Sequence, residues 1–377
     1  MRTSTDSIVD GARPSDDPPL PARARPAIRL TRPSRAALRY AAGVAFCLLA
    51  VVALVLLARR LTDTTWPLQR ANLDLVVAAG LVYLASFVFR GLGWQRLFPA
   101  QARPDRSRCL AACGAAAASG VVLPFRLDYV VKFSTLRRLG GVPLGLDVIA
   151  LSIVSLGLID AVAMLPLAIA ALATSDAVFR APLIVVILFC LGCIGVLAAG
   201  PRLATLPLLS RWGRLQALSR RVAESTAISR STFQAGGFLL GCWLSRALGN
   251  LLLLSALGVG FSPTFALVVL CMAAAASILP ITTGGAIVGV GATSGVLVLL
   301  GVPTAVAINY SLASGLLLTA SALFAALVGG AGSLLLTLRR RRLLAAAPAA
   351  SPVAVSDAGG RRARALRPVR VNAATEP

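Results

Sequence analysis

The chain has 377 residues, of which 57% are hydrophobic and only 14% are charged, and its mean hydropathy is +0.83. An ordinary soluble domain does not combine this balance with repeated apolar runs of about 20 residues, so the composition predicts a polytopic membrane protein. The net charge of +23 gathers toward the two ends of the chain. Because no aromatic or folded platform separates these charges, they indicate contact with anionic lipid headgroups and exclude nucleic-acid binding as the main role.

The sequence contains no histidine, which is the commonest general base and a common metal ligand. Its seven cysteines lie in or next to apolar runs, so we expect them to pack as small hydrophobic residues. The sequence shows no Ser-His-Asp set, no phosphate-binding glycine loop and no acidic metal motif. We therefore expect a protein that is not an enzyme and that uses neither a cofactor nor a metal.

Residues 1–36 are rich in Pro, Arg, Asp and Ser and predict a disordered basic tail in the cytoplasm. An all-α transmembrane domain is expected over 37–338, and residues 339–377 predict a second disordered basic tail. Within the domain, 200–232 carries six arginines against one glutamate, which is typical of an amphipathic helix on the cytoplasmic surface.

Long apolar runs predict the helices that cross the membrane. The expected spans, in chain order, are 37–58, 75–94, 144–172, 183–199, 235–257, 265–279, 286–300 and 305–338. Arg90, near the end of the second span, is expected to extend to the membrane interface. The basic loop after this span predicts a cytoplasmic face there. Because 265–279 and 286–300 could form two crossings or one outer re-entrant hairpin, we expect six or eight crossings with both termini cytoplasmic.

The stretch 111–141 combines a run of small residues, a proline at Pro124, and then Arg126, Asp128 and Lys132, which is the only lysine. If the small-residue run crossed the membrane, the basic residues after it would lie outside, against the positive-inside tendency. A re-entrant hairpin on the cytoplasmic side removes this conflict, provided that neighbouring helices cover its irregular backbone.

A similar pattern recurs later in the chain. AAAASGVVLP at 115–124 is followed by AAAASILPITTGG at 273–285, where Pro280 breaks the run and Gly284 and Gly285 permit close approach of the backbone. Two such breaks, entering from opposite faces, are expected of an inverted repeat with a binding site near the bilayer midplane. Two alternatives stay open, namely chance recurrence of alanine-rich runs and a simple helix end at each proline.

Asp160 and Arg246 are the most central ionisable residues of the predicted spans, where each costs roughly 2.5–3.5 kcal/mol to insert. They could pair with each other as a structural clamp. Alternatively, Arg246, with Asn250 one turn later, could join Arg126 and Lys132 in a cationic pocket for a phosphate or carboxylate headgroup.

Several short motifs in this order carry a family resemblance. Their residues are Arg90 and Trp94, then Leu123, Pro124, Arg126 and Lys132, then Asp160, and finally Leu279, Pro280, Gly284 and Gly285. Over most of 40–337, the chain resembles the flippase-like transmembrane region of lysylphosphatidylglycerol synthases, and still more its stand-alone integral-membrane relatives. The resemblance implies a membrane protein that handles lipids.

The chain departs from the family pattern at three places. Asp128 and Tyr129 stand where Gly-Glu is usual, Ser155 and Leu156 replace an acidic residue and an arginine, and a residue at or near Gly289 replaces a glutamate. The soluble aminoacyl-transferase domain of the full synthases is absent from this sequence. We therefore do not expect synthase activity, and the lost acidic residues leave the family's headgroup chemistry without support here.

The sequence favours a protein that binds or translocates a lipid with an anionic headgroup, of phospholipid or isoprenoid-phosphate type, between the two broken segments. One alternative is a non-catalytic membrane subunit that docks a glycosyltransferase or another envelope enzyme. Another is a membrane transferase that uses a lipid-phosphate donor, with Asp128 or Asp160 as its base. Arginine supplies 36 of the 37 basic residues, and alanine is abundant, which together indicate a GC-rich bacterial genome and hence a bacterial plasma membrane.

Overall fold

A computed structural model describes residues 71–121, 127–139, 145–203, 229–278 and 285–346, together with Leu56, Leu68 and Leu123. Some of the predictions above lie outside the described residues. These are the placements of Pro124, Arg126, Pro280 and Gly284, the terminal segments 1–36 and 347–377, the predicted span 37–58 apart from Leu56, and 204–228 of the predicted surface helix.

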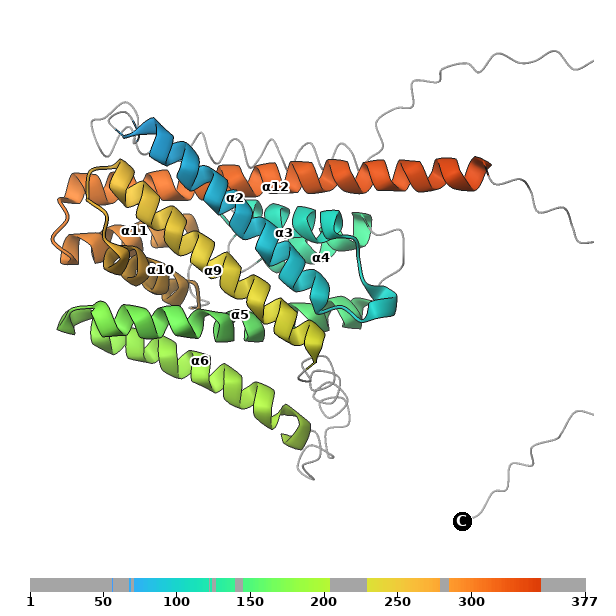
Figure 1. Cartoon of the computed structure of the whole chain (residues 1–377), viewed down its shortest axis with the longest axis horizontal. Helices are drawn as coiled ribbons and strands as arrows, with labels where there is room; N and C mark the ends of the chain where they lie inside the picture. Colours follow the sequence, from blue (N-terminus) through green and yellow to red (C-terminus); the bar gives the residue numbers. More distant parts are fainter. Residues whose placement is uncertain are drawn as a thin grey trace, which may run out of the picture. The chain divides into compact units, whose positions relative to one another are not determined.

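Helices make up nearly all of the described residues (Figure 1). They are α2 Leu73–Arg96, the short 3-10 helix η1 Ala100–Ala102, α3 Arg106–Gly120, α4 Asp128–Leu139, α5 Leu146–Thr174, α6 Ala177–Leu203, α9 Arg230–Ala256, α10 Pro263–Ile278, α11 Gly285–Leu299 and α12 Thr304–Ala346. No strand occurs in this part of the chain.

Five helices of the described residues are long and apolar enough to cross a membrane, namely α2, α5, α6, α9 and α12. Their positions follow the predicted spans closely and confirm an all-α polytopic membrane fold. Two boundaries differ most. α6 begins at Ala177 and includes Pro182, because neighbouring helices allow a membrane helix to tolerate a proline. α12 continues to Ala346, beyond the predicted end of the last span.

Polar side chains mark where two of the spans begin. The Asn72 side-chain oxygen accepts hydrogen bonds from the backbone N–H of Asp74, at 3.0 Å, and of Leu75. The Ser229 hydroxyl accepts one from the backbone N–H of Thr232 at the start of α9. Such N-caps satisfy donors that have no partner within the helix, which is why α2 and α9 begin at these residues.

α2 and α9 form the most extensive helix pair, and they run antiparallel. Gly93 near the end of α2 lies against Leu239 near the start of α9, while Tyr83 bonds to Asn250 further along. The end of α2 therefore lies beside the beginning of α9. Because α3 and α4 follow α2, and α10 and α11 follow α9, these two helix pairs enter the bundle from opposite ends.

The members of each of these helix pairs pack against each other, α3 with α4 and α10 with α11. α3, α10 and α11 contain 15, 16 and 15 residues. A 15-residue helix is about 22 Å long, which is short of a hydrocarbon core of about 30 Å. We call α3 and α4 the first hairpin and α10 and α11 the second hairpin. The short α3 agrees with the re-entrant hairpin expected for 111–141. Two crossings and one outer re-entrant hairpin both stay open for α10 and α11.

Small residues hold α3 tightly against α12, which lies alongside it (Figure 1). A Cβ added to Gly114 would lie 2.5 Å from the carbonyl oxygen of Ala322. One added to Gly329 would lie 2.5 Å from the backbone nitrogen of Ala111. Because lipid competes equally for apolar side chains, close backbone packing of this kind is a main source of helix association in a membrane.

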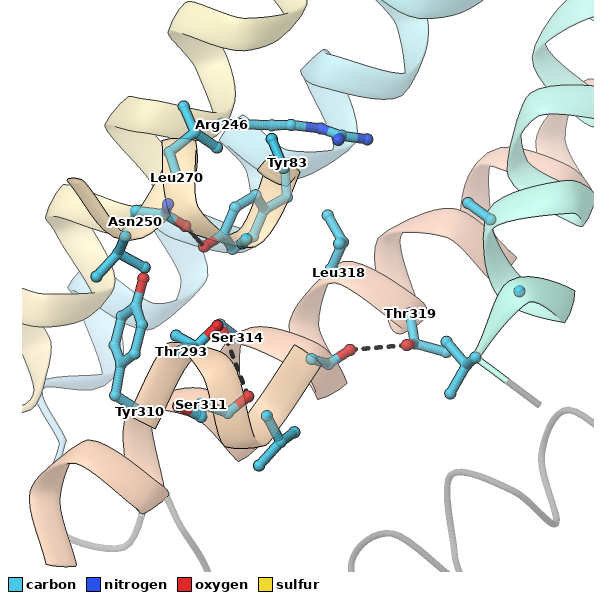
Figure 2. Close-up of a pocket in the computed structure, with 18 of the residues that line it drawn as sticks. Tyr83, Arg246, Asn250, Leu270, Thr293, Tyr310, Ser311, Ser314, Leu318 and Thr319 are labelled. Atoms are coloured by element: carbon cyan, nitrogen blue, oxygen red, sulfur yellow. Dashed lines mark hydrogen bonds between the residues drawn. The ribbon is translucent and has the colours of Figure 1, made fainter. Parts of the chain in front are cut away.

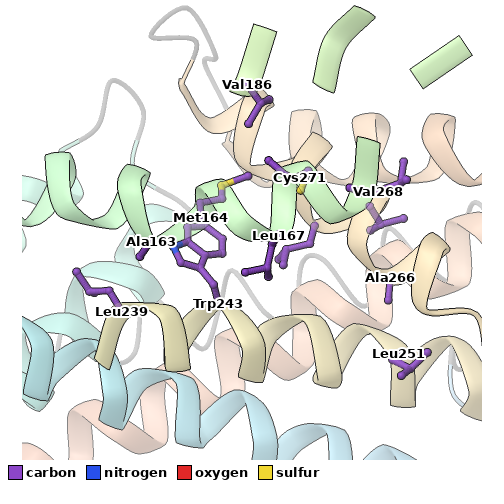
Figure 3. Close-up of a cluster of buried hydrophobic side chains, with 14 of the residues drawn as sticks. Ala163, Met164, Leu167, Val186, Leu239, Trp243, Leu251, Ala266, Val268 and Cys271 are labelled. Atoms are coloured by element: carbon purple, nitrogen blue, oxygen red, sulfur yellow. The ribbon is translucent and has the colours of Figure 1, made fainter. Parts of the chain in front are cut away.

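Large apolar side chains pack where α5, α6, α9 and α10 meet (Figure 3). Trp243 of α9 reaches toward Met164 and Leu167 of α5, and Cys271 of α10 lies in the same cluster. The six described cysteines are all buried, as expected for small hydrophobic residues. On the outside, the spans expose large apolar side chains such as Leu81 and Val185, which suits a surface that faces lipid.

Candidate functional site

A cavity of about 350 Å³ lies between the two hairpins and is lined from α2, α3, α9, α10, α11 and α12. Gly120 and Val121, at the end of α3, form part of its wall. Ala273 and Ala274, near the end of α10, form another part. Both small-residue segments recognised in the sequence therefore border the same cavity. In each case the bordering residues belong to or directly follow the helix before the predicted break, α3 before Pro124 and α10 before Pro280.

One wall of the cavity is cationic. It carries Arg246 and Asn250, one turn apart on α9, together with Tyr83 of α2, whose hydroxyl donates a 2.7 Å hydrogen bond to the Asn250 side-chain oxygen (Figure 2). The guanidinium carbon of Arg246 lies 5.8 Å from the ring centre of Phe87 and 5.4 Å from that of Trp243. Contact with ring faces stabilises the charge without supplying a counter-ion.

The Arg246 guanidinium forms no salt bridge among the described residues, and its Nε is buried without a hydrogen-bond partner there. Buried donors in folded proteins nearly always have a partner. An arginine with a free, buried donor beside a cavity is therefore suited to an anion that enters from outside the chain.

The opposite wall carries hydroxyl groups. Ser311, Ser314 and Thr319 of α12 and Thr293 of α11 line the cavity, and Tyr310 stands between them and the Tyr83–Asn250 pair (Figure 2). Apolar residues of α3, α10 and α12 complete the lining. The cavity thus joins a cationic wall, a hydroxyl wall and an apolar surround.

Asp160 lies outside this cavity lining, in a buried ion pair that joins α2 to α5. Its Oδ2 is 2.6 Å from Nη2 of Arg90, and the two side chains are 12% and 23% exposed. The Trp243 indole N–H donates to the Asp160 backbone carbonyl at 3.1 Å. The proposed clamp between Asp160 and Arg246 is therefore wrong, as is the expectation that Arg90 reaches the interface. Where the dielectric constant is low, removing either charge would leave the other without a counter-charge, which is strongly destabilising.

Lys132 does not line the cavity either. Its ammonium lies 4.4 Å from the ring centre of Trp94, and the indole N–H of Trp94 donates to the Ser152 hydroxyl at 3.1 Å. Burial lowers the pKa of Lys132, whose helix α4 is not one of the five long spans. Lys132 therefore does not share the cavity with Arg246, so the cationic pocket that was one alternative for Arg246 does not include Lys132.

The remaining predicted residues lie at the hairpin ends. Asp128 begins α4. Gly120 lies on the cavity wall, and a Cβ added to it would be 3.5 Å from the Cβ of Asp128. Gly285 begins α11.

Sequence reasoning missed part of the lining. The missed polar residues are Tyr83, Thr293, Tyr310, Ser311, Ser314 and Thr319. The α12 hydroxyls carried a usable signal, because at about 100° per residue the positions 311, 314 and 319 fall on one face of a helix.

Four of the residues behind the family resemblance, Arg90, Trp94, Lys132 and Asp160, lie close together in the part of the chain that the structure describes. Arg90 pairs with Asp160, and one turn after Arg90 on α2, Trp94 lies under Lys132. The family model for the lysylphosphatidylglycerol synthase TM region matches residues 40–317. Comparison with curated proteins finds no match, and neither does comparison with solved structures. The chain therefore belongs to the lysylphosphatidylglycerol synthase TM region family and is a multi-pass membrane protein related to lipid modification or translocation.

Proposed function

We propose that this protein binds the headgroup of an anionic lipid in the cavity and carries it across the membrane, with Arg246 as the counter-charge of the headgroup. The observation behind the proposal is the guanidinium of Arg246, which forms no salt bridge among the described residues and whose Nε is buried without a partner there, beside a cavity of about 350 Å³ between two opposed hairpins. The guanidinium fork fits a phosphate because it can donate two parallel hydrogen bonds to its oxygens.

The position of Arg246 on a helix long enough to span the membrane makes this arginine informative. A charge at bilayer depth costs roughly 2.5–3.5 kcal/mol even on insertion scales, so an arginine without a salt-bridge partner among the described residues needs another reason to be there. The rings of Phe87 and Trp243 offset part of this cost. An incoming phosphate would offset the rest, and its acyl chains would stay in the surrounding bilayer.

The two hairpins support movement as well as binding. In the proposed orientation, the first hairpin enters from the cytoplasm, the second enters from the opposite face, and both chain termini are cytoplasmic in a bacterial plasma membrane. A site between two such elements can open to either side when one of them moves. The proposed activity is non-enzymatic, since the lipid changes sides without a covalent bond being made or broken.

The direct test is a headgroup-accessibility assay in proteoliposomes. The vesicles would contain a fluorescent phosphatidylglycerol, and a membrane-impermeant quencher would report the fraction in the outer leaflet. Wild type would be compared with Arg246→Gln and with Arg137→Gln. Arg137 is an exposed arginine of α4, so this control loses the same charge away from the cavity.

We expect wild type and Arg137→Gln to make the inner-leaflet lipid accessible, and Arg246→Gln to lose most of this activity. If vesicles with and without wild type show the same accessibility for several anionic lipids, the proposed transport is wrong. Equal activity of Arg246→Gln and wild type would remove Arg246 from the site.

A further inference from the structure

We infer that the turn 162–166 of α5, which Pro166 loosens, is a hinge, and that the end of α5 moves about it together with α6 and α10. This movement shifts the α10 wall of the cavity against the wall that carries Arg246. The inference rests on the proposed function and names the part of the fold that moves when a headgroup crosses. It comes from a difference between the two halves of α5, 146–160 and 161–174.

The first half of α5 is fixed to α2 and α9 by polar contacts. The Ser152 hydroxyl accepts a hydrogen bond from the indole N–H of Trp94 at 3.1 Å. Asp160 pairs with Arg90 at 2.6 Å, and its backbone carbonyl accepts from the indole N–H of Trp243 at 3.1 Å. Because hydrocarbon offers no water to replace a broken bond, displacing this half would leave polar groups unpaired. The first half therefore stays with α2 and α9.

The second half of α5 has no polar side chain that joins it to another described helix. All of its side chains are apolar except that of Thr174, whose hydroxyl donates to the Ala170 carbonyl of the same helix at 3.0 Å. In a membrane, lipid tails can take the place of apolar contacts, so such contacts hold helices together only through close packing. The second half can therefore change its position at a lower cost than the first.

Two helices pack on the end of α5 and would move with it. Leu167 lies in one buried apolar cluster with Val186 of α6 and Cys271 of α10 (Figure 3). α5 ends at Thr174 and α6 begins at Ala177, so the connection between them is short. α6 packs mainly on α5, and α10 packs on both. The end of α5, α6 and α10 thus form one apolar group of helices.

Pro166 lies between the fixed part of α5 and this apolar group, inside the helix and six residues after Asp160. Proline has no backbone N–H, so the Val162 carbonyl receives no hydrogen bond from it, and its ring presses on the preceding turn. Kinks in helices most often occur at such prolines. The Pro166 side chain is exposed and fills no space in the core, so its effect is on the backbone.

Bending at this hinge changes the cavity. α10 carries four of the residues that line it, namely Val269, Leu270, Ala273 and Ala274. Arg246 lies on α9, which stays with the first half of α5. A tilt of the apolar group would therefore move α10 away from α9 and open the cavity toward the lipid between them. The first hairpin lacks this freedom, because a Cβ added to Gly114 would lie 2.5 Å from the α12 backbone.

The test replaces the proline by a residue that completes the helix. Pro166→Ala restores the backbone N–H and removes the ring, so it should stiffen the hinge. In the proteoliposome assay, the rate at which inner-leaflet phosphatidylglycerol becomes accessible should fall about tenfold, which corresponds to one restored backbone hydrogen bond. Phosphatidylglycerol affinity, measured by native mass spectrometry, should stay within about twofold of wild type, because no lining residue changes.

Pro263→Ala is the matched control. Pro263 is also exposed, but it is the first residue of α10, where a helix has no use for the missing N–H. Its replacement should leave both transport and lipid binding at the wild-type level. The unfolding temperature of Pro166→Ala should stay the same or rise, which separates a stiffer hinge from a damaged fold.

A distance measurement tests the movement without relying on transport. Spin labels would be attached at Val185→Cys of α6 and Leu244→Cys of α9, two exposed positions, with Cys47→Ser in every sample. The six described native cysteines are buried. We expect double electron–electron resonance to give a broad distribution of label distances when Pro166 is present and a narrower one in Pro166→Ala. Pro263→Ala should leave the distribution broad.

Slower transport and a narrower distribution in Pro166→Ala, with lipid binding retained, would support the hinge. Transport by Pro166→Ala at the wild-type rate would overturn it, and so would an unchanged distribution. A loss of lipid binding would also overturn it, because Pro166 would then shape the site itself. The proposed function fails separately, if wild type transports no anionic lipid, and in that case the distance distributions alone decide whether the hinge exists.

Discussion

Arg90 and Arg246 are both arginines within helices long enough to span a membrane, yet their surroundings differ. Arg90 lies 2.6 Å from Asp160 and joins α2 to α5. Arg246 lies against the rings of Phe87 and Trp243, beside a cavity and without a carboxylate partner in the described residues. The comparison separates two uses of a partly buried arginine: the one paired with Asp160 stabilises the fold, and the one without a salt bridge in the described residues is available to a ligand.

The largest expected effect comes from breaking the ion pair. Asp160→Asn leaves Arg90 buried without its counter-charge, which should lower the stability by about 3–5 kcal/mol. Thermal unfolding of the purified protein in detergent, followed by fluorescence-detected gel filtration, measures this loss.

The double variant Arg90→Met with Asp160→Leu serves as the control. Replacing both charges by apolar side chains of similar size should recover most of the stability, because no uncompensated charge remains. If the double variant is as unstable as Asp160→Asn, an uncompensated charge does not explain the loss of stability. That result would contradict the assignment of Arg90 as an arginine whose role is to pair with Asp160.

A second variant displaces the wall of the cavity that α3 provides. The added Cβ of Gly114→Ala would meet the backbone of Ala322 at 2.5 Å, so α3 must shift against α12, at a cost of about 1–3 kcal/mol. Gly157→Ala is the matched control, because no other helix among the described residues has an atom within 4 Å of its added Cβ. Alanine's higher helix propensity should leave that control at least as stable as wild type. Equal stabilities of the two variants, measured by thermal unfolding, would contradict the close packing of α3.

Arg246 should behave in the opposite way to Arg90. Arg246→Gln removes a partly buried charge that has no salt bridge among the described residues, so the unfolding temperature should stay the same or rise. Its affinity for phosphatidylglycerol should fall roughly tenfold to a hundredfold, the scale of a charge-assisted hydrogen bond. Arg246→Lys keeps the charge but loses the fork, and should bind with intermediate affinity. Thermal unfolding measures the effect on stability, and native mass spectrometry on the same samples measures the effect on lipid binding. A loss of stability without a loss of binding would refute the distinction between a structural Arg90 and a ligand-binding Arg246.

The smallest effect is expected at Lys132. Lys132→Met loses the contact with Trp94 but also removes a buried ammonium, so the stability should change by less than about 1 kcal/mol. Because Lys132 does not line the cavity, phosphatidylglycerol binding should be unchanged. Binding reduced as strongly as in Arg246→Gln would restore Lys132 to the headgroup site.

The long spans could be predicted from sequence because bilayer thickness sets the length of an apolar helix. The two small-residue segments could be recognised because small side chains and prolines depart from that pattern. The pairing of Asp160 could not be predicted, since its partner is 70 residues away and depends on how α2 packs against α5. The hydroxyls of Ser314 and Thr319 were overlooked because serine and threonine often bond to their own helix without any role in a site.

The central claim is that Arg246 holds the phosphate of a bound lipid. An experimental structure of the protein in nanodiscs that contain phosphatidylglycerol tests it most directly. We predict phosphate density within about 3 Å of the Arg246 guanidinium. A cavity without headgroup density, together with lipid phosphates ordered only at exposed arginines such as Arg137, would contradict the claim.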